Sequence, residues 1–219
     1  TQFYKRREVK DMIAYLRLVH TPADAISFNR IVNVPTRGIG AKTLQNLHAW
    51  AAANHWQPAD AVIELATNPE VQHPFRGRAF NALHNFGEML FAWMTVSEGS
   101  TVGDLFDVIL EQTRYREYVD DGTDEGRDRW DNVMELRNVA AGANADMTLS
   151  EFLEQVALVS ETDNLEEVPN STTLLTLHAA KGLEYPVVFI TGLEEGMLPH
   201  SRSMEDAEEL AEERRLFSV

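Results

Sequence analysis

The sequence predicts a mostly α-helical protein in which a helical subdomain is inserted into a partial α/β domain with a parallel sheet. Three observations favour this fold class. Apolar residues recur at helical spacing from residue 7 to about residue 160. Proline and glycine interrupt that pattern repeatedly. Two short runs rich in apolar and β-branched residues, TTLLTLHAA and YPVVFITGL, occur only after residue 170, and the second is nearly continuously apolar, as in a strand buried on both faces.

The N-terminal segment is expected to contain the end of a strand followed by two helices. Residues 1–4, TQFY, look like the end of a β-strand, and residues 7–20 carry a helical apolar stripe. Thr21 is expected to cap the next helix, residues 26–33, with proline at its first position and Asp24 completing a capping box.

A glycine-rich turn and a long helical region come next. Proline and two glycines force residues 34–40, VPTRGIG, to turn, and residues 41–55 resume a helix. Helix breaks are expected at Gln57-Pro58, Asn68-Pro69, His73-Pro74, Glu98-Gly99-Ser100 and Asp120-Asp121-Gly122. Two apolar stripes are interpreted as core, because burying such a face stabilises a helix. They are Phe80, Leu83, Phe86, Leu90 and Trp93, and Val102, Leu105, Phe106, Ile109 and Leu110. Residues 161–171 are polar and acidic and are predicted to form a linker.

Composition excludes several function classes. The 219 residues include no cysteine, so disulfides, zinc-thiolate sites, iron-sulfur clusters and catalytic thiols are excluded. No run approaches the roughly 18 apolar residues of a membrane span, and the start lacks a signal peptide, so a cytoplasmic protein is expected. The histidines lack a second ligand at metal spacing, and the acidic run at 120–131 lacks the spacing of a calcium loop, so no metal site is predicted.

Charge is distributed unevenly along the chain. The formal net charge is -16, from 19 Lys+Arg and 35 Asp+Glu. Residues 1–48 hold eight basic and three acidic side chains, or +5, which leaves -21 for the remaining 171 residues. Because phosphate attracts Lys and Arg, contact with nucleic acid is expected within this first segment.

The basic segment contains the turn VPTRGIGAKTL. A Gly-hydrophobic-Gly turn before a helix presents backbone N–H groups where the helix dipole favours an anion, and a phosphate fits there. Ile39 is expected to point inward as an anchor, and Arg30 lies one element upstream. The form is that of a helix-hairpin-helix contact to duplex DNA without base readout, although a plain helix-helix turn is an alternative. The candidate DNA-binding residues here are Arg37, Gly38, Ile39, Gly40 and Lys42.

A long motif near the C-terminal end resembles a known family. Residues 176–203, TLHAAKGLEYPVVFITGLEEGMLPHSRS, followed by EERRLF at 212–217, resemble motif V and the first half of motif VI of the UvrD/PcrA/Rep group of superfamily 1 DNA helicases. FYKRREVKDMIAYLRL and NRIVNVPTRGIGAKTL also resemble that group. The resemblance implies that residues 1–20 and 166–219 are parts of the RecA-like motor domain 2A, and that residues 21–165 are the inserted helical 2B subdomain.

The resemblance also implies roles for single residues. Thr176 and His178 would contact single-stranded DNA, while Gly182 and Glu184 would bind the nucleotide. Such residues at the carboxyl end of a parallel strand suit ligand binding. The alternative is that Thr176 and His178 satisfy local backbone groups and that Glu184 pairs with Lys181 on the surface.

The function implied is that of a fragment of an ATP-dependent 3′-to-5′ DNA helicase. The G-x-x-x-x-G-K-[ST] loop and an acidic magnesium site do not occur in the sequence, so the fragment is expected to be inactive and to hold no complete catalytic site. ATP and Mg²⁺ would serve the intact parent and would not be bound by the fragment. The expected partners are DNA at a duplex/single-strand junction and the remaining motor domains, with no membrane partner. Exposed sheet edges would also allow a fragment dimer.

Two other function classes stay open. One is a non-enzymatic DNA-binding or protein-interaction module whose acidic helical surface docks a partner. The other is a nuclease-associated relative that has lost its motor.

Overall fold

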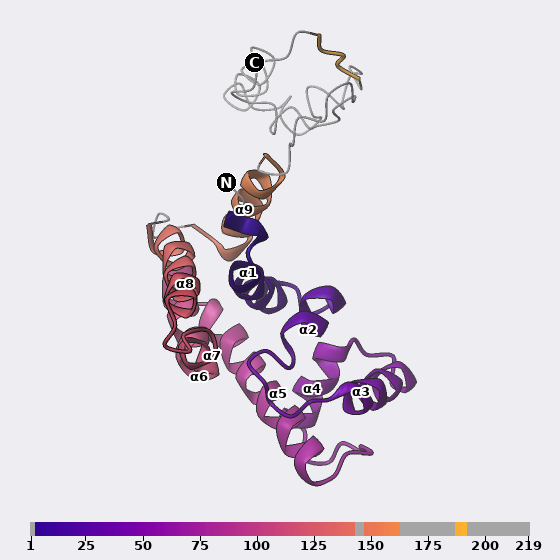
Figure 1. Cartoon of the computed structure of the whole chain (residues 1–219). Helices are drawn as coiled ribbons and strands as arrows, with labels where there is room; N and C mark the ends of the chain where they lie inside the picture. The colour runs from indigo at the N-terminus through magenta and orange to yellow at the C-terminus, as the bar shows by residue number, and fades with distance from the viewer. Residues whose placement is uncertain (1–2, 143–146, 163–186, 192–219) are drawn as a thin grey trace. The chain divides into compact units, whose positions relative to one another are not determined.

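The computed structural model in Figure 1 describes residues 3–142, 147–162 and 187–191. Its contacts divide the chain into two units, Thr1–Ala157 and Leu158–Val219. The described part of the chain is helical and contains no strand. The elements are η1 (Phe3–Lys5, a 3-10 helix), α1 (Arg7–His20), α2 (Ala25–Ile31), α3 (Ala41–Ala53), α4 (Pro58–Thr67), α5 (Gly77–Ser97), α6 (Val102–Thr113), α7 (Tyr115–Val119), α8 (Asp124–Gly142) and α9 (Leu149–Thr162).

Helix α1 lies in the middle of the first unit. Figure 1 shows it between the α3–α5 group and the α6–α8 group, and it contacts α2, α5 and α8. Its apolar residues are buried, as the helical stripe predicts. The prediction of a helix at residues 7–20 is therefore confirmed.

Two predictions at the N-terminal end are wrong. Phe3–Lys5 form a 3-10 helix in place of the strand end, closed by a hydrogen bond from the Arg6 amide to the Phe3 carbonyl (3.1 Å). The cap of α2 is Asp24 and not Thr21, because the Asp24 carboxylate accepts from the amides of Ile26 and Ser27, both at 3.0 Å. The helix consequently runs from residue 25 to 31 instead of 26 to 33.

The expected apolar core is confirmed. Leu83, Phe86, Leu90 and Trp93 of α5 are completely buried, and all five residues of the α6 stripe are buried. Phe80, the first residue of the α5 stripe, is only partly buried and packs against the core. Most expected breaks coincide with helix ends, and α4 and α6 begin with capping boxes at Gln57 and Thr101. Two breaks were missed: α8 ends at Gly142 and α9 begins at Leu149, and Arg114 separates α6 from α7 in a left-handed conformation, with φ 51°.

Helices α4 and α5 approach each other closely at Gly87. A Cβ atom there would lie 2.0 Å from the carbonyl oxygen of Val62, so no other residue fits. Helix α5 also contacts the α2–α3 turn, where the Arg37 guanidinium lies 5.1 Å from the ring centroid of Phe86.

The predicted parallel sheet stays a prediction. Residues 163–186 and 192–219, which carry most of it, lie outside the described ranges. Within residues 187–191 the chain has no strand geometry, and Val187 and Phe189 are 71% and 88% exposed. The predicted dimer through sheet edges is likewise untested.

Candidate nucleic-acid interface

The turn between α2 and α3 is held from inside by one apolar anchor. Ile39 is 1% exposed, so it points inward as expected. Gly38 has φ +80°, a conformation that favours glycine. The Val34-Pro35 peptide bond is cis.

Asn33 organises the same turn and was missed by the sequence analysis. Its side-chain oxygen accepts hydrogen bonds from the amides of Arg37 (2.8 Å) and Ile39 (3.1 Å). An asparagine just before a proline- and glycine-rich turn commonly bonds to the backbone that follows it, so the signal was present in the sequence. Two of the N–H groups expected to face an anion are therefore already bound within the protein.

Arg37 also points toward the protein. Its guanidinium donates to the carbonyls of Ile31 (2.9 Å) and Val34 (3.0 Å) and to the hydroxyl of Tyr15 (2.6 Å). It lies 5.1 Å from the ring centroid of Phe86, in cation-π contact. Burial raises the pKa of Tyr15 to about 12 despite the opposing effect of Arg37, so Tyr15 stays a neutral phenol at neutral pH.

The nearby Arg30 is engaged as well. Its guanidinium pairs with Asp11 at 2.7 Å, and Asp11 in turn accepts from the hydroxyl of Tyr115 at 2.9 Å. Burial and the Asp11 carboxylate raise the pKa of Tyr115. Arg30 therefore ties α1 to α2. Direct phosphate contact by Arg37 stays a prediction, and Lys42 is the exposed basic residue of the turn.

The N-terminus of α3 is open to a ligand. Gly40 is its N-cap, and no side chain caps it. Within the described ranges, no side chain accepts from the amides of Ala41, Lys42 or Thr43, which have no partner within the helix. A Cβ atom at Gly40 would meet nothing within 4 Å, and its φ of -84° suits any residue. The free donors thus lie after Gly40, and the protein itself does not require glycine there.

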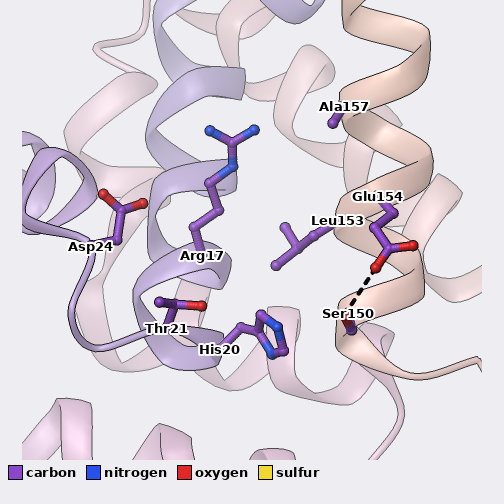
Figure 2. A pocket seen from close by; sticks show the side chains of 8 residues that line it. All are labelled: Arg17, His20, Thr21, Asp24, Ser150, Leu153, Glu154 and Ala157. Carbon is purple, nitrogen blue, oxygen red and sulfur yellow. Dashed lines mark hydrogen bonds between the residues drawn. The ribbon is translucent and has the colours of Figure 1, made fainter. Parts of the chain in front are cut away.

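A separate cleft of about 440 Å³ lies between the end of α1 and α9. Figure 2 shows Arg17, His20 and Asp24 on one side and Ser150 and Glu154 on the other, with a hydrogen bond from Ser150 to Glu154 (3.3 Å). Its charges are mixed in sign, so it does not favour an anion as the α3 N-terminus does.

Asp24, on the wall of this cleft, has a lowered pKa. Burial favours its neutral form, but hydrogen bonds from Ser27 and Ile26 and the charge of Arg17 outweigh that effect. The carboxylate therefore stays ionised as the cap of α2.

The other predicted site residues cannot be placed. Thr176, His178, Gly182 and Glu184 lie outside the described residues. Among the described residues there is no group of three His, Cys, Asp or Glu side chains that could hold a metal ion. None of the described helices is long and apolar enough to cross a membrane.

Comparison with known proteins gives evidence on the family of the chain that is independent of the structure. The model of the family "UvrD-like helicase C-terminal domain" matches residues 1–219. The chain is 41% identical over 232 residues to the ATP-dependent DNA helicase PcrA of Bacillus subtilis, covering 100% of this chain and 30% of that protein. It is 37% identical over 237 residues to the ATP-dependent DNA helicase UvrD1 of Mycobacterium bovis, with the same coverage. It is 34% identical over 229 residues to PcrA of Staphylococcus aureus, again covering 100% and 30%. The chain thus spans about a third of the length of the curated relatives it matches.

Proposed function

Since the chain belongs to the family of the UvrD-like helicase C-terminal domain, we propose that it works as part of an ATP-dependent DNA helicase and holds duplex DNA at the α2–α3 turn. The relatives bear that activity in their names and are about three times as long. The enzymatic activity would accordingly belong to a longer protein.

One observation carries the duplex-binding part of the proposal. The first amides of α3 have no partner in the described structure, and the residue that precedes them is a glycine that no neighbouring atom requires. When no protein atom excludes a side chain at a glycine, the glycine suits a site where an external group approaches the backbone closely. A backbone phosphate is such a group, because the N-terminal amides and helix dipole attract an anion.

The contact would fix the position of the duplex without reading its sequence. Main-chain amides and Lys42 bind phosphate oxygens, which are the same at every base pair. Asn33, Arg37 and Ile39 would hold the turn in shape while the amides bind. Arg37, Gly38 and Ile39 would then serve duplex binding mainly through this backbone arrangement.

The finer assignments belong to the same proposal. Residues 21–165 would be the 2B subdomain, and residues 1–20 and 166–219 would belong to a RecA-like domain 2A. Thr176 and His178 would contact single-stranded DNA at a junction, with unwinding in the 3′-to-5′ direction. Gly182 and Glu184 would bind the nucleotide in the intact parent, which would supply ATP and Mg²⁺ for the hydrolysis that drives movement.

Duplex binding by the 219-residue chain tests the proposal. We expect fluorescence anisotropy to detect binding to a labelled duplex at low salt, equally for two unrelated sequences. The logarithm of the affinity should fall linearly with the logarithm of the salt concentration, by roughly 0.9 per phosphate contacted.

Two results would contradict the proposal in part. No binding to duplex at low salt would favour a protein-interaction module. ATP hydrolysis by the purified chain above a no-enzyme control would contradict the expectation that its catalytic site is incomplete.

A further inference from the structure

A second cleft lies against the α2–α3 turn that leads to the proposed phosphate site. It has a volume of about 450 Å³ and is lined by the turn itself, by α5 and by the junction of α6 and α7. We call it the turn cleft, and the residues used below are Thr36, Arg37, Glu88, Gln112 and Arg114. Its size falls within the range of roughly 300–1,000 Å³ of ligand sites.

Two hydrogen-bond donors of the turn cleft are available. The side-chain oxygen of Gln112 accepts from the indole N–H of Trp93 at 2.9 Å, which fixes the amide so that its NH₂ group is left to donate elsewhere. Arg114 is exposed, and in the described part of the chain its guanidinium has no hydrogen bond or ion pair. This distinguishes it from Arg37, whose donors bind protein oxygens.

The charge of the cleft favours an anion. Arg37 and Arg114 both line it, against the single carboxylate of Glu88. Glu88 is 60% exposed, and one of its carboxylate oxygens lies 3.5 Å from the imidazole of His84, one turn earlier in α5. The net charge of the lining is positive in a chain whose total is -16.

Arg114 also occupies an unfavourable backbone conformation. Its φ of 51° and ψ of 42° are left-handed, a region that glycine and asparagine adopt more readily than arginine. An arginine at such a position destabilises the fold relative to glycine, and strained residues cluster at functional sites. A contact of the arginine side chain with an external anion would account for its presence.

We propose that the turn cleft binds a second backbone phosphate of the same DNA duplex, through the guanidinium of Arg114 and the amide of Gln112. The inference rests on the proposed function, because it extends the phosphate contact of α3 across the turn. Thr36 and Arg37 line the cleft and belong to the turn that leads to the amides of α3.

Arg114→Gly separates this role from a purely structural one. Glycine relieves the left-handed strain, so the melting temperature should rise. The duplex affinity should nevertheless fall about fivefold, and the salt dependence should decrease by about one phosphate contact. Arg114→Asn, which also suits the left-handed conformation, should lower the affinity in the same way.

Arg116→Ala is the matched control. It removes the same charge two residues later, where the side chain stacks on Trp130 and lies 3.9 Å from Asp120, away from the cleft. An equal loss of affinity in Arg116→Ala would overturn the proposal, because the effect would then be general electrostatics. A raised melting temperature with unchanged affinity in Arg114→Gly would also overturn it.

Two further measurements are needed. One distinguishes the turn cleft from the α3 site on which the inference rests, and the other distinguishes duplex DNA from a free phosphate ion. If a bulky residue at Gly40 weakens duplex binding but Arg114→Gly does not, phosphate binding in the turn cleft is ruled out and phosphate binding at the N-terminus of α3 is retained. If neither variant changes binding, the proposed function itself fails. Inorganic phosphate at constant ionic strength is the probe for a free anion. If it raises the melting temperature of the wild type but not of Arg114→Gly while duplex binding is unchanged, the duplex assignment is overturned.

Discussion

At the α2–α3 turn, residues of similar chemistry have different roles. Arg37 and Arg30 bind carbonyl oxygens, a phenol and a buried carboxylate, whereas Lys42 is exposed. The basic character of residues 1–48 was readable from the sequence, but the direction of each side chain was not. That direction depends on Asp11 and Tyr15, which reach the turn only because α1 packs against it.

The burial of Ile39 was predictable, because an apolar side chain between two glycines in a turn is stabilised when it is removed from water. Asn33 was not singled out, because asparagine is common in loops and its partners are two backbone amides four and six residues away. The left-handed Arg114 was unpredictable, because arginine carries no signal for that conformation.

Asp24→Ala should destabilise the protein by about 1 kcal/mol at neutral pH, because the cap of α2 is lost. The pKa of Asp24 is lower in the folded protein than in the unfolded chain. Its contribution is therefore complete above the unfolded pKa of about 4 and is lost as the pH falls through the folded value. Urea unfolding of wild type and variant between neutral and acidic pH measures the difference. A difference that stays constant down to the lowest pH would contradict the assigned cap.

Among the elements, the helices were predicted well where apolar spacing and breakers agree. Helix α1 begins at Arg7 and ends at His20 as expected, because its stripe is regular and the chain turns immediately afterwards. The 3-10 helix at Phe3–Lys5 was mistaken for a strand end, since four aromatic and polar residues carry no periodicity. The α6–α7 junction was missed because it contains neither proline nor glycine.

Gly87→Ala should destabilise the α4–α5 pair by about 2 kcal/mol or more, because the added methyl would collide with the Val62 carbonyl. Gly142→Ala is the control: its Cβ would meet nothing within 4 Å, and alanine is the better helix former. Thermal unfolding of both variants checks the prediction. Equal melting temperatures for wild type and Gly87→Ala would show that the helices do not approach as closely as described.

For the whole molecule, the acidic net charge conceals a basic N-terminal segment. The chain carries -16, yet its first 48 residues carry +5 and include the turn with the open amides of α3. Duplex DNA should therefore approach along this segment and the adjoining turn cleft, while the acidic surfaces elsewhere in the chain repel phosphate. The family could be recognised from residues 176–203, whereas the structure describes mainly the helical region that precedes them.

The most direct test of the account is the duplex affinity of Gly40→Val. Valine suits the backbone of Gly40, and its Cβ would meet no protein atom within 4 Å, so the protein should stay folded, with a melting temperature lowered only slightly by the poorer N-cap. If a phosphate lies against the α3 amides, the side chain will block it and the affinity at low salt will fall about tenfold or more, equivalent to roughly 1.4 kcal/mol. Wild-type affinity in a fully folded Gly40→Val protein would contradict duplex binding at this turn.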